Sequence, residues 1–334
     1  MYIKVYAKRI LLMDAHTTNS QSPTLGRRIE SEIHSVIVGK PEATRAILMA
    51  LFAGLHVLIE DIPGVGKTTL AKTVAACTGL DFGRIQFTPD LLPGDITGMT
   101  VWSPEKQEFI FKAGAIMRQF ILADEINRAS ARTQSSLLEA MQEGAVTVDG
   151  HTYPLEQPFF VIATQNPIQF TGTFVLPEGQ LDRFGVCIRL GYPTQQEETE
   201  VLRRFRTDNP LLHTKAVCGP DDILHARQSV RDTHIDEKIE RYITALAAAT
   251  RENEYVRLGL SPRGTLQLMR ASQAVAHLEG RNYVIPEDVD EALGYVVPHK
   301  IVVNEQARME GISSSVIVER ICSETPKPDR IASS

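Results

Sequence analysis

The chain has 334 residues and a mass of 37.0 kDa, which is the length of about two ordinary domains. Hydrophobic residues make up 43% and charged residues 23%, a composition typical of a globular protein rather than a disordered one. The net charge of −6 argues against a chain built mainly to coat nucleic acid, so we expect no nucleic-acid partner.

The four cysteines are far apart in the sequence; none belongs to a CxxC pair, and no histidine pair has metal-ligand spacing. This pattern argues against a disulfide framework and a zinc module, and it predicts a reducing, cytoplasmic compartment. No apolar run approaches the ~18 residues that a membrane span needs. We therefore do not expect an integral membrane protein.

The N-terminal residues, 1–25, mix basic and apolar side chains without a signal-peptide cleavage pattern, and they predict a flexible extension. Apolar residues then recur at helical spacing over 28–55, with a turn at Gly39-Lys40-Pro41 that divides two helices. The segment HVLIE (56–60) predicts a short buried strand. A Gly-rich loop and a helix over 67–78 follow it.

Three further apolar runs predict buried strands, at 120–124, 159–164 and 186–190, and a helical pattern over 133–143 separates the first two. Strands that alternate with helices in this way indicate a parallel sheet with helices on both faces. The sequence therefore predicts an α/β fold.

Two segments interrupt the alternation with hairpin patterns. Residues 91–115 form an insert with SPEKQ as its turn, and residues 144–157 surround the favoured two-residue turn Asp149-Gly150. Beyond residue 193 strand patterns largely stop and helical spacing takes over. We therefore expect a core over 26–193, a small helical domain over 194–322 and a flexible tail over 323–334.

A candidate phosphate-binding loop follows the first strand. Residues 61–68 (DIPGVGKT) match the pattern GxxxxGK[ST] except that Asp61 stands where the pattern has its first glycine. In such a loop, backbone N–H groups at a helix N-terminus converge on phosphate oxygens. Lys67 would reach the β- and γ-phosphates, and the Thr68 hydroxyl would bind Mg²⁺. The alternative is a plain tight loop, which the flanking strand and helix make the weaker interpretation.

Polar residues follow two of the other predicted strands. Asp124 and Glu125 close the strand at 120–124, where Asp124 can hold the water shell of Mg²⁺ and Glu125 can polarise an attacking water. Asn166 follows the next strand, where its amide can orient that water. Alone, these residues would suit a helix cap and an ordinary Asn-Pro loop. Their positions after successive strands favour hydrolysis.

Two arginines later in the chain are candidates for binding a γ-phosphate, because a dry phosphate site needs planar and permanently charged donors. Arg183 stands in LPEGQLDRFG and Arg263 in GLSPRGTL. Either one would otherwise pair with a surface carboxylate. Arg128 is a weaker candidate, and the arginines at 203–206 predict a solvated helix face.

This order of motifs resembles the AAA+ ATPases, and the sequence is most similar to the MoxR family, a branch related to the magnesium-chelatase ATPase subunits. The resemblance covers roughly residues 27–310. The segments that carry it are VGKPEATRAILMAL (38–51), HVLIEDIPGVGKTTLAK (56–72), QFTPDLLPGDITG (86–98), ADEINRASARTQSSLLEAMQE (123–143), ATQNP (163–167), LPEGQLDRF (176–184), LSPRGTLQL (260–268) and GRNYVIPEDV (280–289).

The resemblance implies a P-loop NTPase fold of the AAA+ type, with a parallel-sheet core, a helical lid, and ATP with Mg²⁺ as ligands. In it, 91–115 would be the insert at helix 2, and 144–157 would be the hairpin before the first sensor. Val38 and Gly39 would line the adenine pocket. The phosphate loop would bind nucleotide through Pro63, Gly64, Val65, Gly66, Lys67, Thr68 and Thr69.

The resemblance also implies the catalytic roles. Asp124 and Glu125 would form the Walker B pair, with Thr68 and Asp124 at the metal. Asn166 would be the first sensor. Arg183 would be the arginine finger that reaches the nucleotide of a neighbouring subunit. Arg263 would be the second sensor, closing over the bound nucleotide.

For function, the resemblance implies an ATP-hydrolysing ring, expected to be a homohexamer, with chaperone-like remodelling of proteins that carry von Willebrand factor A domains. No D-x-S-x-S motif occurs here, so such a domain would lie on another chain. Three alternatives stay open: a chelatase-like motor subunit for metal insertion, a DNA-translocating ring, and a nucleotide switch without hydrolysis. The acidic balance weighs against the second, and the set Asp124, Glu125 and Asn166 weighs against the third.

Overall fold

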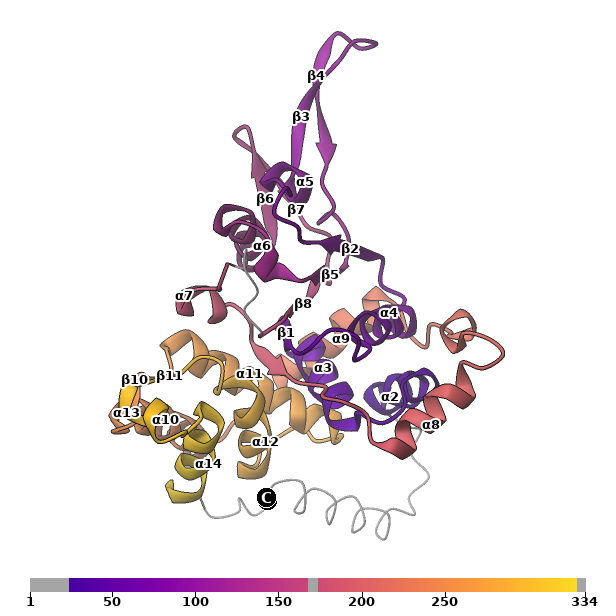
Figure 1. Cartoon of the computed structure of the whole chain (residues 1–334). Helices are drawn as coiled ribbons and strands as arrows, with labels where there is room; N and C mark the ends of the chain where they lie inside the picture. Colours follow the sequence, from indigo (N-terminus) through magenta and orange to yellow (C-terminus); the bar gives the residue numbers. More distant parts are fainter. Residues whose placement is uncertain (1–23, 168–173, 329–334) are drawn as a thin grey trace.

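The computed structural model describes residues 24–167 and 174–328 (Figure 1). A five-stranded parallel sheet lies at its centre, with the strands in the order β2-β5-β8-β1-β9. Its members are β1 (Val57–Glu60), β2 (Phe82–Gln86), β5 (Phe120–Asp124), β8 (Phe160–Gln165) and β9 (Val186–Ile188). The parallel α/β sheet that the sequence predicts is therefore confirmed.

Strand β2 is the one member of this sheet that the sequence analysis missed. It forms an edge of the sheet and pairs with β5 alone. Only Ile85 among its five side chains is buried. A half-exposed edge strand alternates polar and apolar residues over a short length, and Gly83 weakens that signal further.

Helices cover both faces of the sheet because successive strand side chains point to opposite faces. Ile59 and Leu122 share one hydrophobic cluster with α2 (Leu25–Val36), α3 (Pro41–Ala53) and α4 (Lys67–Thr78). Leu58 and Ile121 face the other way, into a second cluster. That cluster contains the buried face of α6 (Ala131–Glu143).

Two hairpins project from the α6 side of the core (Figure 1). Helix α5 (Pro93–Thr97) leads into β3 (Gly98–Ser103) and β4 (Glu108–Ala113), and β6 (Ala145–Val148) pairs with β7 (His151–Pro154). The rings of Phe111 and Tyr153 stack between the hairpins with centroids 3.8 Å apart. Both hairpins lie where the turn signals at 91–115 and 144–157 predict them.

The C-terminal part of the described chain is helical apart from one antiparallel pair of short strands, β10 and β11. Helices α9 and α11 pack against α3 of the core, so core and C-terminal helices share one hydrophobic cluster. We call the elements from α9 to α14 the lid. The remaining elements are η1 (Ile126–Arg128), which lies between β5 and α6, and, after β8, α7 (Glu178–Leu181), α8 (Gln195–Arg204), η2 (Pro210–His213), α9 (Pro220–Asp232), α10 (Glu237–Glu252), β10 (Val256–Leu258), α11 (Pro262–Leu278), α12 (Pro286–Val296), β11 (Val302–Val303), α13 (Glu305–Met309) and α14 (Ser314–Glu324).

The two ends of the chain differ from expectation where the structure describes them. Most of the N-terminal extension predicted over 1–25 lies outside the described residues, and α2 already begins at Leu25. Helix α14 continues two residues into the tail predicted over 323–334, and Lys327 pairs with Asp290 of α12. That ion pair ties the first part of the tail to the lid. Within the described ranges, no helix is long and apolar enough to cross a membrane.

Candidate nucleotide-binding site

The phosphate loop joins the C-terminal end of β1 to the N-terminus of α4. Gly64 and Gly66 adopt left-handed backbone conformations, with φ of 85° and 89°, which glycine takes without strain. Gly66 directly precedes α4, whose first N–H groups have no partner within the helix. The loop therefore presents backbone donors and the positive end of a helix dipole at one point.

Lys67 lies against this loop. Its Nζ donates to the carbonyl oxygens of Asp61 at 2.7 Å and Ile62 at 2.9 Å. Partial burial lowers the pKa of Lys67, an effect that the carboxylates of Asp61, Asp124 and Glu125 oppose. The ammonium is thus placed between the loop and the two acidic residues at the C-terminal end of β5, Asp124 and Glu125.

Asp61, the departure from the general loop pattern, has a structural use. Its Oδ1 accepts the N–H of Ile62 at 2.9 Å, and its Oδ2 accepts the N–H groups of Leu190 at 2.6 Å and Gly191 at 2.7 Å. A glycine at this position would leave those donors unsatisfied. The carboxylate therefore fastens the start of the phosphate loop to the segment between β9 and α8.

A cavity of about 190 Å³ lies beside the loop, with a mainly apolar lining. Five predicted residues line it, and so do side chains of α8 and of the segment after β9, which the sequence analysis did not include. The predicted ones are Val38, Gly64, Val65, Gly66 and Thr69, and the additional ones include Leu190, Pro193, Val201 and Phe205. An apolar cavity of this kind beside a phosphate loop suits a flat purine base.

Helix α8 is held to the core beside this cavity. Gly39, with φ of 69°, leaves room for it, because a Cβ there would collide with the Glu197 carboxylate. Arg204 donates to the carbonyl oxygens of His34 at 2.8 Å and Ser35 at 3.0 Å, at the C-terminal end of α2. The sequence predicts a solvated helix face for the arginines at 203–206, and for Arg204 this prediction is wrong. Its charge satisfies carbonyls at a helix C-terminus.

Asp124 ends β5 next to the loop. Its Oδ1 accepts the Thr164 hydroxyl at 2.7 Å, and its Oδ2 accepts Arg84 at 2.7 Å in an ion pair. Thr164 lies on β8 and is fully buried, and Arg84 lies on β2. The carboxylate is therefore held from both neighbouring strands.

Glu125 follows in a left-handed backbone conformation, with φ of 57°, which is uncommon for a residue with a side chain and clusters at functional sites. Its N–H donates to Thr164 Oγ1 at 2.9 Å. Its carboxylate accepts Gln86 at 3.3 Å and Arg128 at 3.0 Å. The contact with Gln86 places the Glu125 carboxylate beside the C-terminal end of β2.

Asn166 lies one residue beyond β8, at the same edge of the sheet as Asp124 and the phosphate loop. Its backbone carbonyl accepts Asn127 Nδ2 at 3.0 Å. The structure thus brings together Lys67, Asp124 and Asn166, as expected from the strand order. Residues 168–173, which follow, lie outside the described part of the chain.

The two predicted arginines lie elsewhere. Arg183 and Arg263 line a second cavity, of about 150 Å³, together with His56 and Gln142. This cavity adjoins the N-terminal end of β1, where Gly185 N–H donates to the His56 carbonyl at 3.0 Å. The phosphate loop leaves from the opposite end of that strand, and β1 spans roughly 10 Å. In this structure Arg263 therefore lies away from the phosphate loop of its own chain, and its expected closure over a bound nucleotide stays a prediction.

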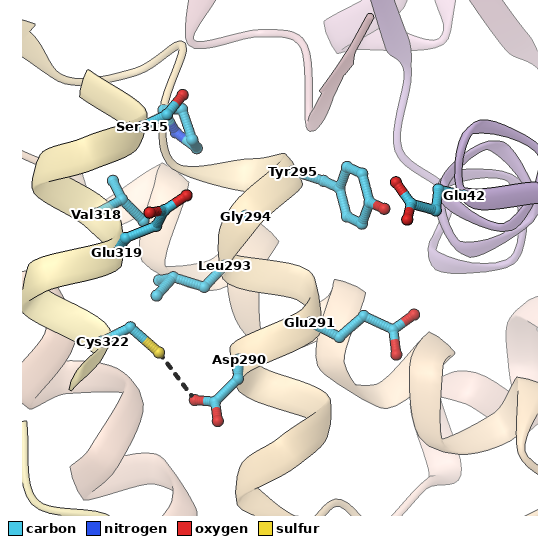
Figure 2. A pocket seen from close by; sticks show the side chains of 11 residues that line it. Glu42, Asp290, Glu291, Leu293, Gly294, Tyr295, Ser315, Val318, Glu319 and Cys322 are labelled. Atoms are coloured by element: carbon cyan, nitrogen blue, oxygen red, sulfur yellow. Dashed lines mark hydrogen bonds between the residues drawn. The ribbon is translucent and has the colours of Figure 1, made fainter. Parts of the chain in front are cut away.

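A further cavity, of about 170 Å³, lies between α12, α14 and α3 (Figure 2). The carboxylates of Glu42, Asp290, Glu291 and Glu319 surround it, and Cys322 Sγ contacts Asp290 at 3.3 Å. None of the predicted site residues lines it. Because carboxylates line it and no lysine or arginine of the described residues does, it is unsuited to a phosphate group.

Sequence reasoning missed Arg84, Gln86 and Thr164, which hold the two acidic residues. Arg84 and Gln86 could not be assigned to the site because β2, the strand that carries them, was not predicted. Thr164 was named only as the end of an apolar run. The sequence offered one clue to Thr164: it occupies the position next to Asp124 on the neighbouring parallel strand.

The donor set suits a nucleoside triphosphate with a divalent cation. Backbone N–H groups and the Lys67 ammonium face the phosphate position, while the Thr68 hydroxyl and the Asp124 carboxylate offer the oxygen ligands that Mg²⁺ prefers. Asp124 is held by Arg84, so the Oδ2 atom would exchange that partner when a cation binds.

Comparisons with known proteins show which sequences and structures this chain is similar to. The model of the ATPase family associated with various cellular activities (AAA) matches residues 56–186, and the model of the AAA lid domain matches residues 248–321. An uncharacterized protein of Bacillus subtilis, YeaC, is 46% identical over 92% of this chain and 95% of its own length. The chaperone MoxR1 of Mycobacterium tuberculosis is 38% identical over 89% of this chain and 81% of its own. A crystal structure of a candidate ATPase from Cytophaga hutchinsonii superposes with a TM-score of 0.84 and 39% identity, over 91% of this chain and 94% of that one.

Proposed function

The chain belongs to the MoxR family of AAA ATPases, and from that premise we propose that it hydrolyses ATP with Mg²⁺ at sites shared between subunits of a ring. The observation that carries this proposal is the position of the two arginines. They lie beyond the N-terminal end of β1, whereas the phosphate loop of the same chain lies beyond its C-terminal end. A site complete within one chain would have its arginines at the loop.

Binding of the nucleotide would use the residues beside the loop. The base would occupy the cavity that Val38 and α8 line, and the phosphates would replace the loop carbonyls as partners of Lys67. Thr68 and Asp124 would hold Mg²⁺, which supplies charge neutralisation between the phosphate oxygens.

Hydrolysis would begin when Glu125 accepts a proton from the attacking water, with Asn166 orienting that water. Glu125 would first leave Gln86 and Arg128, its partners in this structure. Arg183 and Arg263 of the neighbouring subunit would stabilise the charge that develops on the γ-phosphate. One edge of each subunit would thus hold nucleotide, and the opposite edge would supply arginines to the next.

Such a ring has a heterologous interface, in which different surfaces of two copies meet, and repetition by rotation closes it. A hexamer is the expected closure. The output we propose is chaperone-like remodelling of a partner protein, because the relative MoxR1 is named a chaperone. A client with a von Willebrand factor A domain on another chain is the partner that the family suggests. The four cysteines are all free, which fits the reducing cytoplasm.

The test is ATP turnover measured against protein concentration for the unmodified chain, Glu125→Gln and Arg183→Ala. Specific activity should rise with concentration, and both variants should lose it. Mixing the two variants should restore part of the activity, because a Glu125→Gln subunit still offers Arg183 to the intact Glu125 of its neighbour. Turnover that is independent of concentration and of Arg183 would refute the shared site.

A further inference from the structure

Lys300, between α12 and β11, is a buried lysine outside the proposed catalytic set. Its side chain is 1% exposed, and its Nζ donates to the carbonyl oxygens of Asp182 at 3.0 Å and Phe184 at 2.5 Å. The Asp182 carboxylate lies 3.5 Å away. Lysine is rarely buried, because removing an ammonium from water is costly unless partners surround it. The partners here are the two residues on either side of Arg183.

Other lid residues contact the same turn. The Ser261 hydroxyl donates to the Asp182 carboxylate at 3.0 and 3.2 Å, and Gln267 reaches the Asp182 carbonyl at 3.4 Å. His299 Nε2 donates to the Phe184 carbonyl at 2.9 Å. Every one of these donors comes from the lid, and Ser261 is also the N-cap of α11, the helix that carries Arg263. The turn that presents Arg183 is therefore held by the lid.

The side chain of Arg183 has few contacts of its own. Its Nη1 donates to the Gly179 carbonyl at 3.0 Å, and within the described residues its buried Nε has no partner. The direction in which this side chain leaves the backbone thus depends on the turn. An ammonium that binds the carbonyls of residues 182 and 184 together fixes that direction.

We propose that Lys300 is a positioning residue for Arg183, through which the lid sets the geometry of the arginine that acts on the neighbouring subunit's nucleotide. This inference rests on the proposed function. The Asp182 carboxylate lies nearest to the Lys300 ammonium, and Cys187, Arg263 and His299 interact with it electrostatically. Since Arg263 also lies on the lid, a movement of the lid would shift both arginines together.

The first test is steady-state kinetics of Lys300→Met, which keeps the length of the side chain and removes its donors. We expect kcat to fall roughly 10- to 100-fold, as small misplacements of catalytic groups do, with little change in KM. Lys300→Arg should recover much of the loss. The affinity of Lys300→Met for ATP should equal that of the unmodified chain, because the phosphate loop and Lys300 lie at opposite ends of β1.

Arg227 provides the matched control. It is also a buried cation that binds backbone carbonyls, those of Leu51 at 3.0 Å and Phe159 at 3.2 Å, and it also links a lid helix to the core. It does not touch the turn at 182–184. Arg227→Met should lower the free energy of unfolding and leave kcat, measured below its unfolding temperature, within about twofold, because no reacting group depends on it.

The second test separates positioning from folding. Lys300→Met mixed with Glu125→Gln should regain activity, because the Glu125→Gln subunit supplies a well-placed Arg183 to the intact Glu125 of the Lys300→Met subunit. Arg183→Ala mixed with Glu125→Gln is the reference. Recovery in the reference but not with Lys300→Met would overturn the role of Lys300, as would an unchanged kcat. Failure of the reference itself would overturn the shared site. If Lys300→Met does not fold, the experiment is repeated with Lys300→Gln, which keeps one donor group, mixed with Glu125→Gln in the same way.

Discussion

Asp61 occupies a position where the general phosphate-loop pattern has glycine, and the fold gives its carboxylate three backbone donors. Two of these donors belong to the segment that leads to α8, which lines the base cavity. A single carboxylate therefore couples the loop that would bind phosphates to the wall that would bind the base. We therefore expect Asp61 to shape the site through these hydrogen bonds and not through contact with a ligand.

We expect Asp61→Asn to lower the free energy of unfolding by about 2 kcal/mol, because hydrogen bonds to a charged group contribute about 1.5–3 kcal/mol. The amide keeps one acceptor oxygen and turns an NH₂ group towards backbone donors. The affinity of the Asp61→Asn variant for ATP should also fall roughly tenfold, because the phosphate loop is less firmly held. Thermal unfolding and ATP titration measure the two effects. Asp149→Asn, in an exposed hairpin turn, should change neither, and an Asp61→Asn variant that behaved the same way would contradict this role.

Some residues of the candidate site could be predicted from the sequence, and others could not. Lys67, Asp124 and Asn166 were predictable, because each follows a recognisable strand and parallel strands end at one edge. Arg84 and Gln86 were not, since they lie on a strand with one buried side chain. The position of Arg183 relative to the loop was also out of reach, because it depends on where β9 pairs with β1.

At the scale of elements, continuous apolar runs identified β1, β5, β8 and β9, since a strand buried on both faces needs apolar residues throughout. The hairpins followed from turn residues. Helix α8 was predicted only as part of the helical domain. Its place beside the base cavity rests on Gly39 and Arg204, which lie 165 positions apart in the sequence, and contacts at that range leave no local pattern.

Arg204 allows the contribution of α8 to be measured. We expect Arg204→Met to loosen α8 from α2, because the carbonyls of His34 and Ser35 lose their donor. ATP affinity should fall about tenfold, and the rise in melting temperature on adding ATP should shrink accordingly. Arg203→Met is the control, since Arg203 is 74% exposed on the same helix. Equal ATP affinities of the two variants would show that α8 does not depend on Arg204.

At the scale of the whole molecule, the lid shares one of the two hydrophobic clusters of the core, and polar contacts from the lid concentrate on the turn at 182–184. The phosphate loop and this turn occupy opposite ends of the same strand. In the proposed ring, a change at one subunit's nucleotide would therefore reach the neighbouring subunit through the interface that this turn completes, without crossing the sheet. The lid, which holds the turn, is the element that would carry such a change around a ring.

We expect two buried histidines near the junction between core and lid to make the molecule sensitive to acid. His56 at the start of β1 accepts Val161 N–H at 3.1 Å and donates to the Met141 carbonyl at 3.2 Å, and burial lowers its pKa to about 4. Burial lowers the pKa of His299 to about 3. Both rings are neutral in the folded state at pH values where the unfolded chain, with a pKa near 6.5, already binds protons. The contribution of these two rings to stability is therefore fully present above about pH 6.5, and it is lost as the pH falls towards 4 for His56 and towards 3 for His299.

We expect the free energy of unfolding to drop by about 2–3 kcal/mol for each of these histidines between pH 7 and pH 4.5, since one pKa unit corresponds to about 1.4 kcal/mol. Denaturant unfolding at the two pH values measures the drop. His56→Gln lowers stability at pH 7 but removes the titrating group, so its drop should be smaller than that of the unmodified chain. His225→Gln, on the exposed side of α9, should leave the drop unchanged. An equal drop in His56→Gln and the unmodified chain would mean that acid acts through other groups. The neutral, hydrogen-bonded ring of His56, at the N-terminal end of β1, would then not be the acid-sensitive group of the junction.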